Sequence, residues 1–261
     1  MAICRILAAT LLALTVLPLA AFGAQARQGN PVDADPARMA AARAHMFHGM
    51  GGTHSMVLVD RFEHLSGGDD DALLWDAQGW VGGDEQKFWF KTEGEYAFDA
   101  SEFESAQLQA LYSRAISPNF DLQLGVRHDI EPGPSTSYGV VGLQGLAPYW
   151  FEVDAAVFLS DAGDVTARME AEYELLITQR LVLQPRAELH FAAGEIAGHD
   201  LGSGLTETEF GLRLRYEITR EFAPYIGIEW HDLQGDTADL ARLRGEAASD
   251  RVIAVGIRFW F

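Results

Sequence analysis

The chain has 261 residues and carries 38 acidic against 19 basic side chains, a formal net charge of −19. This balance disfavours nucleic acid as a partner, because phosphate binding requires a basic surface. With 48% hydrophobic and 22% charged residues, the chain is neither a disordered polyelectrolyte nor a helical membrane protein. Its single cysteine, Cys4, excludes an internal disulfide and a zinc site built from cysteines.

The N-terminus has the pattern of a secretory signal peptide. Arg5 precedes a long apolar run, and Ala24 and Ala26 supply the small residues expected before a cleavage point. An uncleaved membrane anchor is the alternative. Pro18 and the shortness of the apolar run disfavour it, since a spanning helix needs about 20 apolar residues. We therefore expect residues 1–26 to be a signal peptide.

From residue 55 onward, apolar and polar residues alternate with a period of two. Phe210, Leu212 and Leu214 share one face of such a segment, whereas Arg213 and Arg215 share the other. A strand separates alternate residues in this way, while a helix would scatter the charges around its axis. We expect an all-β fold of about 12 strands, at roughly 55–65, 72–82, 86–99, 102–116, 120–131, 136–147, 149–160, 164–178, 180–193, 204–219, 222–233 and 250–261.

The joints between these segments alternate in length. Tight turns fall at 82–85, 117–119, 147–148, 178–180 and 219–221, and longer joints rich in Gly, Pro and Asp fall at 66–71, 131–135, 160–164, 194–203 and 234–249. Outer-membrane barrels have short periplasmic turns and longer outer loops. The pattern predicts a closed antiparallel transmembrane β-barrel over residues 55–261, with both ends in the periplasm.

A soluble β-sandwich or lipocalin-like barrel also shows alternation. A packed soluble core would not tolerate the ladders of Arg and Glu on one strand face, because unpaired buried charge costs several kcal/mol. Aromatic residues gather at segment ends, as in interfacial girdles: Phe120 and Phe222 on the turn side, Trp75 and Trp230 on the loop side. The chain ends on Phe261, as an outer-membrane strand commonly does. These features favour the membrane barrel.

Residues 27–54 precede the barrel, and we expect them to form a flexible periplasmic leader. Six of the twelve residues from 45 to 56 are His or Met, namely His45, Met46, His48, Met50, His54 and Met56. Thioether sulfur is a soft ligand that selects Cu(I), and imidazole binds copper in either oxidation state. The cluster predicts a copper site. The alternative is a spacer with chance clustering, in which Met56 packs at the head of the first strand.

Several longer motifs point to a known family. They are WDAQGWVGGD at 75–84, GLAPYWFEVD at 145–154, TQRLVLQPRAE at 178–188, FAPY at 222–225, GDTAD at 235–239 and RFWF at 258–261. Together they resemble the copper resistance protein B family over essentially all of residues 55–261. The resemblance implies an outer-membrane barrel of a Gram-negative copper-handling system, with a periplasmic Met/His-rich leader. In this chain the leader holds a single cluster rather than repeated units.

The resemblance implies copper resistance by sequestering periplasmic copper or passing it outward, with copper ions and outer-membrane lipid as partners. A periplasmic copper-carrying protein stays open as a further partner. Five carboxylates are expected to make the lumen attractive to cations: Asp60, Asp76, Glu93, Glu152 and Asp154. The plainer interpretation is a polar lumen ladder neutralised by arginines, namely Arg168, Arg186, Arg213 and Arg215.

Two other functions stay as alternatives. A small general porin is one, although a twelve-stranded lumen is narrower than the channels of 16–18 strands. The other is an outer-membrane phospholipase, which would need a Ser–His pair on the outer barrel face. His128 shares a face with Leu124 and Val126, but the sequence offers it no serine in a recognisable motif. We expect no enzymatic activity.

Overall fold

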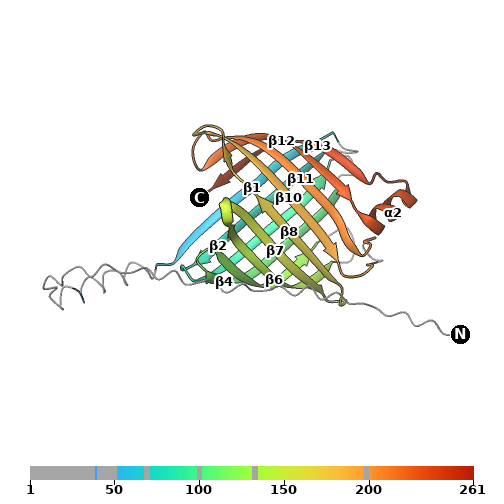
Figure 1. Ribbon diagram of the computed structural model, residues 1–261, viewed down its shortest axis with the longest axis horizontal. Coiled ribbons are helices and arrows are strands. Elements are labelled where there is room, and N and C mark those ends of the chain that lie inside the picture. Colours follow the sequence, from blue (N-terminus) through green and yellow to red (C-terminus); the bar gives the residue numbers. More distant parts are fainter. Residues whose placement is uncertain (1–38, 40–51, 68–70, 99–101, 131–134, 197–199) are drawn as a thin grey trace. The chain divides into compact units, whose positions relative to one another are not determined.

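The computed structural model describes residues 39, 52–67, 71–98, 102–130, 135–196 and 200–261. From residue 52 onward these residues form a barrel of antiparallel strands (Figure 1). None of the helices in the described ranges is long and apolar enough to cross a membrane. The expected signal peptide at 1–26 and most of the expected leader at 27–54 lie outside the described residues.

The described residues form thirteen strands and two helical elements. They are β1 (His54–Ser66), β2 (Ala72–Gly82), β3 (Gln86–Ala97), β4 (Glu102–Ser117), β5 (Phe120–Asp129), β6 (Thr136–Ala147), η1 (Pro148–Trp150), β7 (Phe151–Ser160), β8 (Val165–Glu172), β9 (Leu175–Leu176), β10 (Leu181–Ala192), β11 (Gly204–Tyr216), β12 (Phe222–Leu233), α2 (Gly235–Arg244) and β13 (Ser249–Trp260).

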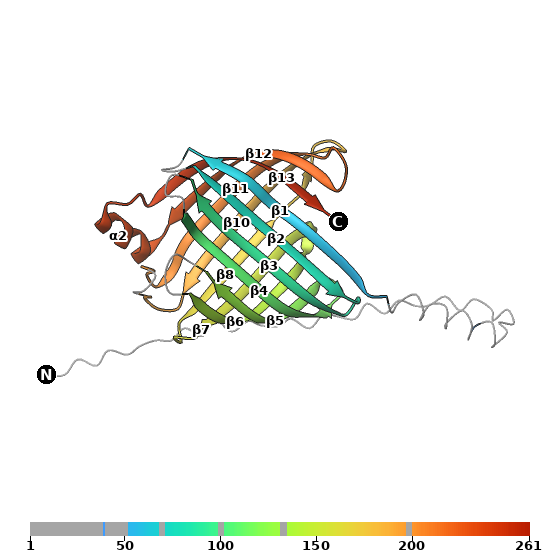
Figure 2. The same cartoon turned by 180° about the vertical axis from the view of Figure 1, so that it is seen from behind.

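The sheet closes on itself. Each strand pairs antiparallel with its neighbour in the chain, and β13 returns to pair with β1. Both β8 and β9 pair with β10, so they share one place in the ring. The expectation of a closed antiparallel barrel of twelve strands is therefore confirmed, and Figure 2 shows the same closure from behind.

The interruption between β8 and β9 has a local cause in Pro185. The segment 164–178 was expected as one strand, but its ladder with β10 breaks at residues 173–174. Tyr173 N–H still donates to the Pro185 carbonyl at 3.1 Å. Proline has no N–H to return the second bond of that pair, so the ladder is interrupted there.

The two ends of the barrel differ. The end where β1 begins and β13 finishes carries the short connections, and we name it the turn end. The opposite end carries the longer connections and α2, and we name it the loop end (Figures 1 and 2). The helix α2 was not expected within the joint at 234–249. The helix ends at a glycine C-cap: Gly245 has a φ of 83°, which glycine adopts without strain.

The strand faces separate by polarity. Apolar side chains point outward over most of the barrel, and examples with about half of their surface exposed are Phe90, Leu108, Val141, Ile226 and Val255. Their neighbours in sequence point into the lumen, where the core lies. One part of that core is an apolar cluster of Trp89, Leu111, Val140 and Phe158. The rest is charged.

Barrel closure depends on the last residue of the chain. Phe261 N–H donates to the Val57 carbonyl at 3.0 Å, and Val57 N–H donates to the Phe261 carbonyl at 2.9 Å. The Phe261 ring lies on the outer surface and is 72% exposed. Two backbone hydrogen bonds of the β1–β13 seam and one lipid-facing aromatic ring therefore depend on this residue.

We expect deletion of Phe261 to reduce the amount of folded protein in the outer membrane, because the seam loses both bonds. The measurement is the heat-modifiable band on gels of outer-membrane fractions. Phe90→Ala is the control, since that ring is also outward-facing but lies away from the seam. Equal folded amounts for the deletion and the parent would show that Phe261 is not needed for closure.

Candidate functional site

The charged side of the lumen is held together by buried ion pairs. Arg213 donates to Glu63 at 2.7 Å and to Glu229 at 2.8 Å, and all three side chains are at most 5% exposed. Buried charges are stable only when they are paired and hydrogen-bonded. The expected arginine ladder is observed: Arg168, Arg186, Arg213 and Arg215 each pair with lumen carboxylates.

Arg186 is the centre of this network. Its guanidinium lies within 4.0 Å of five carboxylates, which belong to Glu170, Glu172, Glu188, Glu209 and Glu229. Some of these carboxylates are shared with other arginines, for example Glu229 with Arg61 and Arg213. Arg186 therefore links carboxylates of β8, β10, β11 and β12 in one network.

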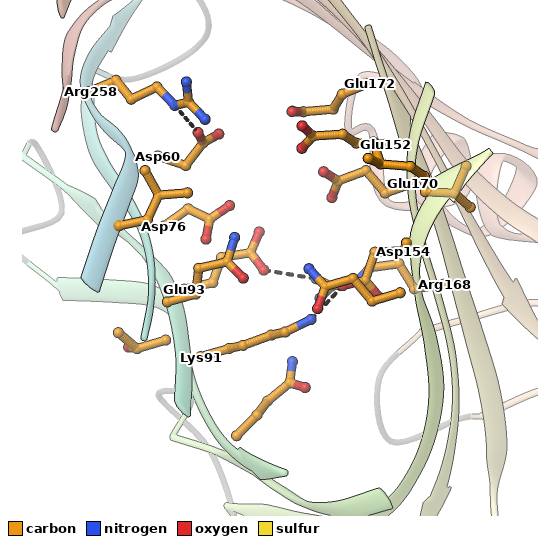
Figure 3. A pocket seen from close by; sticks show the side chains of 18 residues that line it. Asp60, Asp76, Lys91, Glu93, Glu152, Asp154, Arg168, Glu170, Glu172 and Arg258 are labelled. Atoms are coloured by element: carbon orange, nitrogen blue, oxygen red, sulfur yellow. Dashed lines mark hydrogen bonds and ion pairs between the residues drawn. The ribbon is translucent and has the colours of Figure 1, made fainter. Parts of the chain in front are cut away.

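A chamber of about 270 Å³ opens beside this network. Seven acidic and three basic side chains line it: Asp60, Asp76, Glu93, Glu152, Asp154, Glu170, Glu172, Lys91, Arg168 and Arg258. Figure 3 shows acids of β1, β2 and β3 on one side and acids of β7 and β8 on the other. Several are paired, for example Arg258 with Asp60 at 2.5 Å and Arg168 with Glu93 at 2.7 Å.

The register places like charges directly opposite one another in the chamber wall. Glu152 pairs with Glu172 across β7 and β8, and Asp154 pairs with Glu170. Directly opposed like charges destabilise a sheet. Such pairs are tolerable where a cation lies between them, whether an arginine, as at Glu170, or an ion from solution. The chamber therefore has the electrostatics of a cation site.

The acids continue beyond the chamber as a row across the strands, which we name the acidic row. Asp154 opposes Glu170, Glu170 opposes Glu188, and Glu188 opposes Glu209. Glu209 in turn opposes His231 on β12. Because barrel strands are tilted by about 35–45°, a row across them also climbs along the barrel. It begins near the turn end of β7 and finishes near the loop end of β12.

The five lumen acids predicted from the sequence are brought together in this chamber. The sequence pattern did not point to the opposed partners Glu170 and Glu172 as cation ligands, nor to the acidic row. Alternation shows which residues face inward, but the register between neighbouring strands decides which of them meet. The joint between β7 and β8, expected among the longer ones, has only residues 161–164, and its shortness is the signal that could have indicated this register.

The predicted Met/His cluster is only partly described. His45, Met46, His48 and Met50 lie outside the described residues. His54 is the first residue of β1, and Met56 lies within that strand, directly opposite Trp80 of β2. Trp80 packs against the apolar lumen cluster, so Met56 and His54 belong to the luminal face at the turn end.

The register also gives His128 the serine that the sequence did not offer. His128 Nδ1 lies 3.0 Å from Ser137 Oγ, directly across β5 and β6 on the outer face. Among the described residues, no carboxylate forms an ion pair with the His128 ring. Within the described ranges, the pair has no orienting acid of the kind that a hydrolytic triad uses.

Comparison with known proteins supports a family assignment. The model of the family described as copper resistance protein B precursor matches residues 53–261. The chain belongs to this family. It is 40% identical over 240 residues to the copper resistance protein B homolog of Pseudomonas syringae pv. tomato, covering 91% of this chain and 81% of the relative. It is 42% identical over 206 residues to copper resistance protein B of Escherichia coli, covering 79% and 69%.

Solved structures agree on the fold. The NanC porin superposes with a TM-score of 0.53 at 15% identity, covering 78% of this chain and 98% of the porin. At that identity the likeness concerns the barrel alone. Family and fold together make this copper resistance protein an outer-membrane protein.

We expect Glu229→Gln to lower the free energy of unfolding by about 3 kcal/mol, because it removes the buried carboxylate charge that three guanidinium groups share. Glu229 is fully buried and lies within 4.0 Å of Arg61, Arg186 and Arg213. Urea unfolding in detergent, followed by tryptophan fluorescence, measures the change. The control is Asp239→Asn on α2, whose exposed pair with Arg242 should contribute less than about 1 kcal/mol. Similar losses for both variants would contradict the expected role of the network.

Proposed function

We propose that this protein acts in copper resistance by binding periplasmic copper through its leader and holding it in the barrel lumen or passing it outward. The observation that carries the proposal is the chamber, where seven carboxylic side chains surround about 270 Å³ in a member of a copper resistance family. A cleft lined by one sign of charge within low-dielectric walls concentrates ions of the opposite sign. The family indicates which cation enters.

The geometry of β1 supports a periplasmic entrance. Outer-membrane barrels keep their short turns in the periplasm, so the turn end faces that compartment. His54 and Met56 lie there on the luminal face, and Leu58 and Asp60 further along β1 line the chamber. Copper held by the cluster at residues 45–56 would thus be released at the mouth of the acidic lumen.

The ligand types in the cluster suit an oxidising compartment. Thiols would be oxidised in the periplasm, whereas Met and His keep their ligand atoms there. Met46, Met50 and Met56 would supply sulfur for Cu(I), and His45, His48 and His54 would bind either oxidation state. The proposed function is non-enzymatic.

A general porin is the weaker alternative. Ion pairs with almost no solvent exposure fill one side of the lumen, and an apolar cluster fills the other. A diffusion pore for small solutes needs an open aqueous channel. The chamber is lined mainly by acidic side chains, which favours a cation over a neutral or anionic solute.

We expect the triple change Met46→Ala, Met50→Ala and Met56→Ala to weaken Cu(I) binding far more than Cu(II) binding, because thioethers contribute little to the harder ion. Replacing His45, His48 and His54 with alanine should instead remove most of the Cu(II) affinity of the leader. Competition titrations of the purified protein, with Cu(I) under a reductant and with Cu(II), measure both effects.

Strand content by circular dichroism serves as the control for both leader variants. Neither change should alter it, since four of the six residues precede the barrel and the other two lie in its first three positions. Parental affinity for both ions in both variants would exclude the leader as a copper site.

A separate change tests the chamber. We expect Glu152→Gln combined with Glu172→Gln to remove most of the copper tolerance that the protein confers, because the opposed carboxylates of the chamber wall are neutralised. Folding stability should stay equal or rise, since a like-charge pair is relieved. Growth of expressing cells in copper is the readout, with Asp239→Asn on the exposed face of α2 as control. Full tolerance at normal folded amounts would exclude the chamber from function.

A further inference from the structure

The acidic row ends in a group of imidazoles and carboxylates near the loop end of the lumen. The group consists of Glu188, His190, Glu207, Glu209 and His231, and we name it the loop-end cluster. We propose that the loop-end cluster is a Cu(II) site, distinct from both the leader and the chamber. The inference rests on the proposed function for the identity of the metal.

Strand register assembles this cluster from three neighbouring strands. Glu209 of β11 lies directly between Glu188 of β10 and His231 of β12. One position closer to the loop end on this face, His190 opposes Glu207. Directly opposed side chains have their Cβ atoms about 4.5–5.5 Å apart, so all five point into one small region of the lumen.

The donor atoms form two overlapping sets of three, each close enough to hold one ion. His190 Nε2 lies 2.9 Å from Glu188 Oε1 and 3.6 Å from Glu209 Oε1, and His231 Nδ1 lies 4.0 Å from the same Glu209 oxygen. One set consists of Glu188, His190 and Glu209, and the other consists of Glu207, Glu209 and His231. Within each set the donor atoms lie within 4.8 Å of one another. Metal–ligand bonds of about 2.0–2.2 Å separate opposing donors by about 4 Å. A small side-chain movement is sufficient.

His190 points its ring nitrogen Nε2 into this group. Nε2 is shielded from solvent and forms ion pairs with the carboxylates of Glu188 and Glu209. A metal ion that replaces the proton on Nε2 would find the nitrogen and both carboxylates already facing it. The cluster is therefore more than a set of acids on a lumen wall.

The surrounding charges favour a cation and hold its ligands in place. Arg186 contacts both Glu188 and Glu209 and is shared with three other carboxylates, and Arg168 also contacts Glu188 at 3.6 Å. Two shared guanidinium groups thus face three carboxylates, which leaves a net negative charge on the cluster. Residues that hydrogen-bond to metal ligands and fix their orientation typically raise the affinity for the metal. Arg186 contacts two of the carboxylates in this way.

The donor types select the oxidation state. The loop-end cluster offers imidazole nitrogen and carboxylate oxygen, a set of ligands that suits Cu(II). Among the divalent first-row ions, Cu(II) binds such ligands most tightly. It offers no thioether, which Cu(I) would prefer. The cluster therefore complements the methionines expected to hold Cu(I) at the turn end.

The test uses the full-length protein in detergent with the six leader ligands His45, Met46, His48, Met50, His54 and Met56 all changed to alanine. Cu(II) is the probe, with binding measured by equilibrium dialysis and ligand nitrogens by electron paramagnetic resonance. We expect this leader variant to retain one Cu(II) with coupling to two imidazole nitrogens. Adding His190→Asn and His231→Asn should weaken that binding by at least about tenfold.

His128→Asn is the matched control, because it removes a barrel histidine from the outer face and should change nothing. If the double variant does not fold, His231→Asn alone should remove one nitrogen coupling. The inference is overturned if the leader variant binds no Cu(II), or if its binding is indifferent to His190 and His231. Copper tolerance of the leader and chamber variants tests the proposed function separately, so either idea can fail without the other.

Discussion

The exclusion of charge from the lipid-facing surface is the constraint on which the rest of this barrel depends. A charged side chain on that surface costs about 2–4 kcal/mol at the bilayer midplane, so strand charges are directed into the lumen. There the most deeply buried of them must pair with one another, because water does not reach them. The result is the network around Arg186, Arg213 and Glu229, which braces strands far apart in sequence, such as β1 and β11 through Glu63 and Arg213. The same network keeps the barrel from being an open pore.

Pairing cannot be complete in so acidic a chain, which has twice as many acidic as basic side chains. The surplus is not spread evenly. It is concentrated where register sets acid against acid, at Glu152 opposite Glu172 and along the acidic row from Asp154 to Glu209. These positions are destabilising for an empty sheet and become favourable when a cation neutralises them. The residues that destabilise the empty barrel are therefore the same residues that would bind a cation.

Much of the fold followed from local patterns, and the site followed less completely. Alternation of Phe210 and Leu212 with Arg213 and Arg215 was sufficient to predict strands and the contents of the lumen. Pro185 was visible in the sequence, but the break between β8 and β9 also requires knowing which residue it faces. The same holds for His190 and His231, which are 41 residues apart in sequence and meet only through Glu209 on the strand between them. Register is a property of pairs of strands, so it cannot be predicted from the composition of one strand.

The ligands along the lumen change in character from one end to the other. Met56 lies at the turn end, carboxylates follow in the chamber, and the imidazoles of His190 and His231 lie near the loop end. Soft donors favour Cu(I) and nitrogen–oxygen donors favour Cu(II). If both proposed sites are correct, Cu(I) binds most tightly at the turn end of the barrel and Cu(II) binds most tightly at the loop end. Each oxidation state would rest at its own end of the lumen, and transfer of copper from one end to the other would require an oxidant or reductant from outside the barrel to change the oxidation state of the ion.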